Sequence, residues 1–171
     1  LSVGSVISRK NLESLPAIFR AMKTQQGAVS LIRVGTLLPE RLKNEIVGVI
    51  GKNSLIELGS VDEETLQAAY AYCSAFLMPS NFEGFGFPVI EAMAAGCPVV
   101  SSMATSLPEV GGDAALYFDP SKPYEAATHL CDLMNNAQLS IDLRIRGRLR
   151  AGELTWENHL SKLIDVYKSV L

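Results

Sequence analysis

The sequence has little of the features that mark several common protein classes. Its 171 residues include three cysteines and one tryptophan, and 15 basic residues nearly balance 18 acidic ones. No apolar run reaches the roughly 20 residues of a transmembrane helix, and no signal peptide is visible. The net charge of −3 gives no general attraction to nucleic acid or to anionic membranes. We therefore expect a globular, cytoplasmic protein that binds no nucleic acid.

The chain also lacks the usual arrangements of metal-binding and disulfide-forming residues. Cys73, Cys97 and Cys131 have no C-x-x-C spacing, and each lies in an apolar setting that favours a buried free thiol. His129 and His159 belong to no cluster of ligand residues, and no D-x-D pair is present to hold a metal against a diphosphate. We expect that no metal or other cofactor is required.

Apolar runs alternate with amphipathic stretches over the first 120 residues, which predicts an α/β fold. Strands are expected at residues 1–3, 29–34, 54–58, 75–78, 98–101 and 116–118. Helices are expected from Asn11 to residue 22, with Asn11 as N-cap, at 39–50, at 63–72 after an Asp62 N-cap, from Pro88 onward and near Thr105. Right-handed crossovers would make this a doubly wound parallel sheet of about six strands, with ligands at the carboxyl ends of the strands.

The pattern changes after residue 120, where only helices are expected, at 123–135, 139–150 and 155–171. The last of these is amphipathic, with Leu160, Leu163, Ile164 and Tyr167 on its apolar face. An apolar helix face of this kind, with Trp156 beside it, leads us to expect weak self-association.

The fourth strand leads into a loop and helix start with the sequence NFEGFGFPVIE, which brackets its glycines with Glu83 and Glu91. Gly84 and Gly86 let the backbone approach a ligand, and Pro88 suits the first helical position. Amides at this helix start favour phosphate, whereas carboxylates accept hydrogen bonds from hydroxyls. Together they indicate a nucleotide-sugar site. The simpler alternative is a buried strand-to-helix connection with two solvated glutamates.

This stretch resembles the E-x7-E motif of retaining GT-B glycosyltransferases of family 4 (group 1). The resemblance continues in AMAAGCPVV, in SLPEVGG and in AALYFDP, and the opening VG followed by RKN resembles the start of the C-terminal domain of that family. It covers essentially the whole chain. It implies that residues 1–171 form the nucleotide-sugar-binding C-terminal domain, the Rossmann-like half of a GT-B fold with extra C-terminal helices, and that an N-terminal acceptor domain is absent.

The resemblance also implies roles for charged residues. Glu83 would be the catalytic carboxylate, which lies beside the transferred sugar and stabilises positive charge at the anomeric carbon. Glu91 would bind the ribose hydroxyls. Lys10 would neutralise the diphosphate, and Arg9 stands next to it in the sequence. Because neighbouring side chains at a helix start usually diverge, Lys10 is the preferred cation.

Further donor-binding positions follow from the same resemblance. Gly4 lies in the loop that opens the domain, and Val61 lies in the loop that recognises the nucleobase. Backbone N–H groups at the start of the fourth expected helix would bind sugar and phosphate oxygens, namely those of Phe85, Gly86, Phe87 and Val89. Many relatives have an arginine directly after the first glycine, where this chain has Ser5, and this difference puts the second half of the diphosphate clamp in doubt.

The implied reaction is retaining transfer of a sugar from a nucleoside diphosphate sugar to a glycan or lipid-linked acceptor. The opening residues look most like the mannosyltransferase branch, so we favour GDP-mannose over a UDP-sugar. The acceptor would bind the missing N-terminal domain, which could also attach the protein to a membrane surface, and the isolated domain is expected to be inactive. Alternatives are a GT-B epimerase, a phosphorylase, for which no pyridoxal-phosphate lysine motif stands out, and a non-catalytic nucleotide- or partner-binding module.

Overall fold

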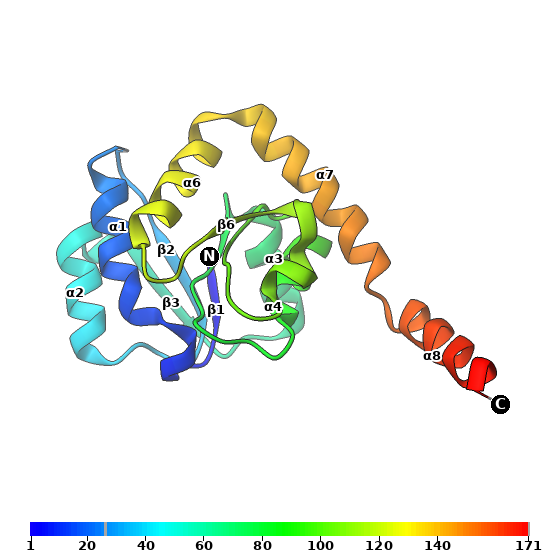
Figure 1. The fold of residues 1–171 in the computed structure, drawn as a ribbon. Coiled ribbons are helices and arrows are strands. Elements are labelled where there is room, and N and C mark those ends of the chain that lie inside the picture. Colours follow the sequence, from blue (N-terminus) through cyan, green and yellow to red (C-terminus); the bar gives the residue numbers. More distant parts are fainter. Residues whose placement is uncertain (26, 171) are drawn as a thin grey trace.

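The chain forms an α/β fold, as a computed structural model describing residues 1–25 and 27–170 shows (Figure 1). The strands are β1 (Ser2–Gly4), β2 (Leu31–Gly35), β3 (Leu55–Gly59), β4 (Phe76–Met78), β5 (Val99–Ser102) and β6 (Ala115–Phe118). The helices are α1 (Leu15–Lys23), α2 (Glu40–Ile50), α3 (Glu63–Tyr72), α4 (Phe87–Ala94), α5 (Leu107–Gly111), α6 (Pro123–Asn135), α7 (Ala137–Glu153) and α8 (Trp156–Val170). All six strands match the predicted positions to within two residues.

The strands form two parallel sheets that lie edge to edge. The order within them is β1-β2-β3 and β4-β5-β6. Two backbone hydrogen bonds connect β1 to β4: the Leu77 N–H donates to the Leu1 carbonyl, and the Leu1 nitrogen donates to the Ala75 carbonyl, both at 2.8 Å. The combined order is therefore 3-2-1-4-5-6, the doubly wound arrangement that was predicted, and the strand order reverses between β1 and β4.

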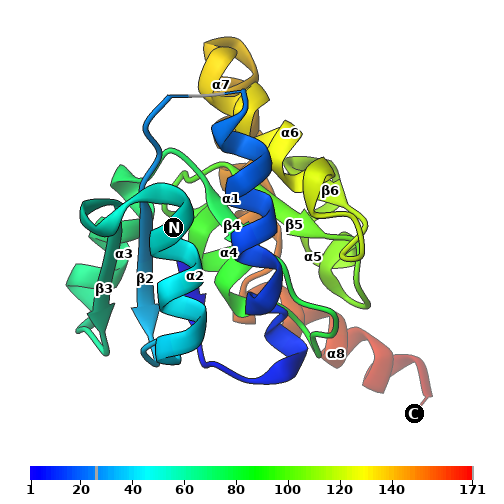
Figure 2. The same ribbon diagram turned by 90° about the vertical axis from the view of Figure 1, so that its left-hand side faces the viewer.

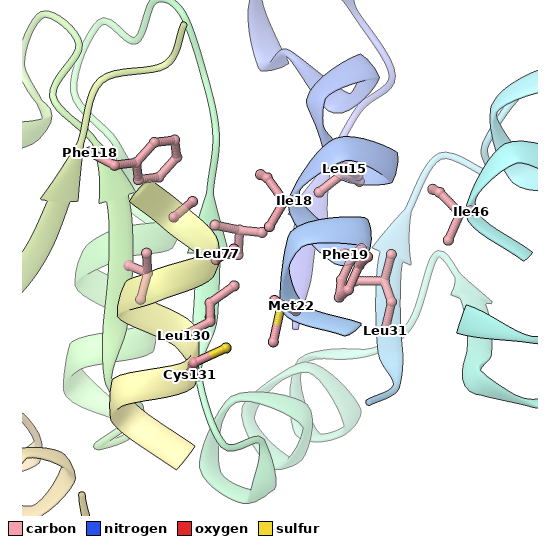
Figure 3. Close-up of a cluster of buried hydrophobic side chains, with 14 of the residues drawn as sticks. Leu15, Ile18, Phe19, Met22, Leu31, Ile46, Leu77, Phe118, Leu130 and Cys131 are labelled. Atoms are coloured by element: carbon pink, nitrogen blue, oxygen red, sulfur yellow. The ribbon is translucent and has the colours of Figure 1, made fainter. Parts of the chain in front are cut away.

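Helices cover both faces of the sheet, and successive residues of a strand point to opposite faces. In β4, Leu77 packs into a core formed with α1, α2 and α6, whereas Phe76 and Met78 pack into a second core with α3, α4 and α5. Figure 2 shows α1, α2 and α6 on the near side of the sheet, and Figure 3 shows Ile18 of α1 pointing toward Leu77. This two-sided burial explains why the central strands read as short, mainly apolar runs.

The first helix begins later than predicted, and Asn11 is not its N-cap. Two short 3-10 turns, Ser8–Lys10 and Leu12–Ser14, precede α1, and Asn11 between them has a left-handed backbone (φ 52°). Its side-chain amide donates to the carbonyls of Pro79 (3.0 Å) and Pro120 (3.4 Å). These partners from distant segments replace the local cap that the sequence indicates.

The prediction of the α3 N-cap is confirmed, because its partner is local. The Asp62 carboxylate accepts a hydrogen bond from the Thr65 N–H at 2.8 Å. This interaction also lowers the pKa of Asp62 below its usual value.

The last two helices, α7 and α8, extend beyond the sheet (Figure 1). Helix α7 packs on α4, where a Cβ at Gly147 would lie 3.3 Å from a Met93 carbon. Helix α8 buries none of its residues and extends away from the body of the protein (Figure 1). It follows the predicted helix, apart from Leu171, which lies outside the described residues. Within the described chain, no helix combines the length and the apolar character needed to cross a bilayer.

Candidate functional site

The loop between β4 and α4 is fixed by two hydroxyl side chains from the loop after β5. The Thr105 hydroxyl accepts a hydrogen bond from the Glu83 N–H (2.9 Å) and donates to the Glu83 carbonyl (2.7 Å). The Ser106 hydroxyl lies 2.9 Å from the Glu83 carbonyl and 3.0 Å from that of Phe85. Neither residue was singled out from the sequence, because their spacing from Glu83 gives no local signal. Together they hold the backbone that carries the Glu83 side chain.

The Glu83 carboxylate is buried, with 6% of the residue exposed, and three donors surround it. One oxygen accepts from the Lys10 ammonium (2.8 Å) and the Ser80 hydroxyl (2.7 Å), and the other accepts from the Arg9 guanidinium (2.8 Å). Burial alone would raise the pKa of Glu83, but the hydrogen bonds from Lys10 and Ser80, the Lys10 charge and the Arg9 contact outweigh it and lower that pKa. Glu83 is therefore an anion at neutral pH.

Arg9 and Lys10 converge on one carboxylate, and our expectation that they diverge is wrong. They lie in the 3-10 turn before Asn11 and not in an α-helix, so the usual angle between neighbouring helical side chains does not apply. The Arg9 carbonyl also accepts a hydrogen bond from the Asn81 N–H at 2.7 Å. This turn is thereby tied to the Glu83 loop through both backbone and side chains. The Lys10 side chain is 11% exposed and that of Arg9 is 45% exposed.

Gly4, at the carboxyl end of β1, lies directly against Lys10. Its φ is +123°, and a Cβ there would be 3.7 Å from the Lys10 nitrogen. The Gly4 carbonyl accepts a hydrogen bond from Arg33, which is 1% exposed and also donates to the carbonyls of Ser2 and Val34. Burial lowers the pKa of Arg33 and the Glu57 charge raises it, with burial the larger effect. Arg33 was not predicted from the sequence, where the only indication is an arginine inside an otherwise apolar strand.

Three of the four N–H groups predicted to bind the donor, at the start of α4, are free to donate in this structure, and that of Val89 is not. In the described part of the chain the N–H groups of Phe85, Gly86 and Phe87 have no hydrogen-bond partner. The Val89 N–H donates to the Gly86 carbonyl at 2.9 Å, so that it is already engaged. Gly86 has a φ of +106°, and a Cβ on it would lie 2.7 Å from a Leu107 carbon, so no other residue fits this turn.

Glu91 and Val61 lie apart from the Lys10–Glu83 cluster. Glu91 is the fifth residue of α4, and one of its oxygens accepts a hydrogen bond from the Tyr70 hydroxyl of α3 at 3.0 Å. Val61 lies between β3 and α3, at the same edge of the sheet but two strands from β1. The structure thus brings Gly4, Arg9, Lys10 and Glu83 together, whereas Glu91 and Val61 make no contact with this cluster among the interactions of the described residues.

The region around this cluster contains a groove but, within the described residues, no group of metal ligands. A groove of about 550 Å³ lies between the α4 start and α8, lined in part by Phe85, Phe87, Trp156 and His159, and it does not include Lys10 or Glu83. Across residues 1–25 and 27–170, no three His, Cys, Asp or Glu side chains gather closely enough to hold a metal ion. That binding proceeds without a metal remains a prediction.

Comparison with known proteins gives relatives over the whole chain. The family described as glycosyl transferases group 1 matches residues 1–150. The O-antigen chain mannosyltransferase B of Escherichia coli is 40% identical over 111 residues, which are 65% of this chain and 29% of that protein. The MMP alpha-(1->4)-mannosyltransferase of Mycolicibacterium hassiacum is 30% identical over 148 residues, 84% of this chain and 36% of that protein. The chain therefore spans about a third of the length of these relatives.

Solved structures share the fold. A sucrose-phosphate synthase from Thermosynechococcus elongatus superposes with a TM-score of 0.83 at 24% identity, over 99% of this chain and 45% of that one. Anabaena HepE in complex with UDP gives 0.82 at 21% identity, over 99% and 48%. These likenesses confirm the predicted Rossmann-like fold of the GT-B type, and the family match confirms the predicted glycosyltransferase family. The chain belongs to the glycosyl transferases of group 1.

Proposed function

We propose that this chain is the donor-binding, C-terminal domain of a retaining glycosyltransferase. It binds a nucleoside diphosphate sugar, and the whole protein transfers the sugar to a hydroxyl of a glycan or lipid-linked acceptor. The observation that carries this proposal is the convergence of Lys10 and Arg9 on Glu83, beside the free N–H groups at the start of α4. The cluster follows β1 and β4, where the strand order reverses and where ligands bind in doubly wound sheets.

The relatives support mannose as the sugar, and we propose GDP-mannose as the donor on the resemblance of the opening residues to mannosyltransferases. Two of them, from Escherichia coli and Mycolicibacterium hassiacum, are mannosyltransferases. The solved HepE complexes with UDP and UDP-glucose support a nucleotide-sugar ligand for this fold. Because the chain spans about a third of those mannosyltransferases, the acceptor site is proposed to lie in the remaining part of the protein.

The chain's own residues divide the work in this proposal. Lys10 and Arg9 stabilise the negative charge of the leaving diphosphate, together with the amides of Phe85, Gly86 and Phe87. Arg9 supplies the second cation in place of the arginine that relatives have at the Ser5 position. An ammonium has three N–H donors, so Lys10 can contact a phosphate while it keeps Glu83.

The two carboxylates act on different parts of the donor. Glu83, held ionised by its three donors, stabilises positive charge at the anomeric carbon as the bond to the diphosphate breaks. Glu91 accepts hydrogen bonds from the ribose hydroxyls, and Val61 contacts the base. In this arrangement the free protein keeps Glu83 and the two cations neutralised until the diphosphate arrives.

Calorimetric titration of the purified chain with GDP, UDP and ADP tests the proposal. We expect binding of nucleoside diphosphates, with GDP bound most tightly. Hydrogen bonds to charged groups contribute about 1.5–3 kcal/mol, so Glu91→Ala should weaken GDP binding by about ten- to a hundredfold. Glu64→Gln, an exposed glutamate of α3, is the control and should bind normally. Failure of the folded chain to bind any nucleoside diphosphate would overturn the proposal.

A further inference from the structure

Glu91 does not stand alone on α4, because a tyrosine from α3 holds it. Tyr70 is completely buried, and its hydroxyl donates to one Glu91 oxygen at 3.0 Å. Its ring packs edge-on against Phe76 of β4, with ring centroids 5.5 Å apart and an interplanar angle of 76°. The tyrosine is therefore fixed by packing before it meets the carboxylate, and it can orient Glu91 more firmly than Glu91 can orient it.

In this hydrogen bond Tyr70 is the donor and Glu91 is the acceptor. Burial, followed by the charge and hydrogen bond of Glu91, raises the pKa of Tyr70 well above its usual value. The phenol therefore keeps its proton, and an ionised carboxylate can only accept. One Glu91 oxygen is thus engaged, while the other has no hydrogen-bond partner among residues 1–25 and 27–170. This second oxygen is available to a ligand.

We propose that Tyr70 is a positioning residue, which fixes Glu91 so that its second oxygen meets the ribose hydroxyls of the donor. This inference rests on the proposed function, and it adds a residue from α3 that acts through Glu91 without touching the donor. A glutamate that is free to rotate must be ordered when the nucleotide binds. Ordering one such side chain lowers affinity by about two- to twelvefold, and Tyr70 removes that loss in advance.

A purely structural role for Tyr70 makes a different prediction. If the hydrogen bond only stabilises the fold, its removal lowers the affinity for every nucleotide equally. If it positions Glu91, its removal affects only ligands that carry ribose hydroxyls. The ratio of affinities for GDP and 2′,3′-dideoxy-GDP, measured within one variant, separates these cases because any unfolded fraction cancels in the ratio.

The test uses titration of the purified chain and four variants with both nucleotides. Tyr70→Phe keeps the ring against Phe76 and removes only the hydroxyl. We expect it to weaken GDP binding about three- to tenfold, within the range for freeing one side chain, and to leave dideoxy-GDP binding unchanged. In a Glu91→Ala background, which has no side-chain acceptor, the same substitution should change neither affinity, because the two residues act as one unit. Tyr72→Phe is the matched control, since Tyr72 lies on the same helix and is 90% exposed.

The outcomes separate this inference from the function on which it rests. Equal losses for the two nucleotides, or no loss in Tyr70→Phe, would overturn the positioning role while leaving nucleotide binding intact. An effect of Tyr70→Phe that persists in the Glu91→Ala background would also overturn it. If the wild-type chain binds neither nucleotide, the proposed function and this inference fail together.

Discussion

Replacing Glu83 by glutamine should tighten the binding of a nucleoside diphosphate, although Glu83 is the proposed catalytic residue. In the free protein the Glu83 carboxylate forms ion pairs of 2.8 Å with both Lys10 and Arg9. These are the two cations that are proposed to bind the diphosphate. Glu83→Gln keeps the shape of the side chain and an oxygen that can accept from Ser80 (2.7 Å in the wild type). It removes the charge, and it replaces the oxygen that accepts from Arg9 by an NH2 group, which frees that guanidinium.

The magnitude follows from the geometry. A phosphate oxygen bound by the Lys10 ammonium would lie roughly 6 Å from the Glu83 carboxylate, two hydrogen-bond lengths away through one nitrogen. Two like unit charges at that distance repel by about 2.8 kcal/mol at an effective dielectric constant of about 20, and by about half of this at 40. Each 1.4 kcal/mol is a factor of about ten in affinity. We therefore expect GDP to bind roughly ten- to a hundredfold more tightly to Glu83→Gln, and sugar transfer by the full-length protein to fall by about 10²–10³.

The assay is calorimetric titration at low and at moderate salt, with GDP and with the uncharged nucleoside guanosine. The gain should appear with GDP, shrink as salt rises and be absent with guanosine, because the effect is a charge repulsion. Glu64→Gln again serves as the control for loss of one negative charge, at an exposed position of α3 outside the Glu83 cluster. Unchanged or weaker GDP binding by folded Glu83→Gln would refute the reasoning and make the carboxylate a direct ligand of the donor.

Three other predictions follow from the same structure. The pKa of Glu83 is lowered from its usual 4.5, so the stability from its pairing is fully present above pH 4.5 and is lost as the pH falls through the folded pKa. Urea unfolding at pH 7, 5, 4 and 3 should therefore show a smaller loss of unfolding free energy with falling pH in Glu83→Gln than in the wild type. Diphosphate binding is proposed to rely on Lys10 and Arg9, so excess EDTA should leave GDP affinity unchanged, and a collapse that Mg²⁺ or Mn²⁺ restores would contradict this. The purified chain should bind donor but transfer no sugar until the rest of the protein is joined to it, because acceptor orientation supplies several kcal/mol of the barrier; measured transfer by these residues alone would move the acceptor site onto them.

Local signals were sufficient to predict most of the fold. Mainly apolar runs flanked by turn residues gave the six strands, and the central strands β4 and β5 are buried on both faces of the sheet. Asp62 was predicted as an N-cap from its position before two acidic residues, and its partner Thr65 lies three residues away. Where an interaction closes within one turn of the chain, the sequence contains both partners and their spacing.

The errors arose where distant segments supply the partner. Asn11 is a residue type that favours the N-cap position, but its side-chain amide donates to the carbonyls of Pro79 and Pro120. Helix α1 begins only at Leu15. The contact between Tyr70 and Glu91 joins α3 to α4, and no periodicity in either helix indicates it. The error at Val89 has a different cause, since its N–H closes a tight turn that depends on the positive φ of Gly86.

The charge cluster shows how far topology extends such predictions. Strand order 3-2-1-4-5-6 makes β1 and β4 neighbours, so the segments after them must meet although they lie about 74 residues apart in the sequence. Proximity of Lys10 to Glu83 therefore follows from the predicted fold, but their pairing does not. The pairing requires the 3-10 turn and the left-handed Asn11, which direct both cations to one carboxylate. It determines the electrostatic state of the free site: the cations are neutralised before a ligand arrives, so removing the Glu83 charge releases them instead of removing a ligand contact.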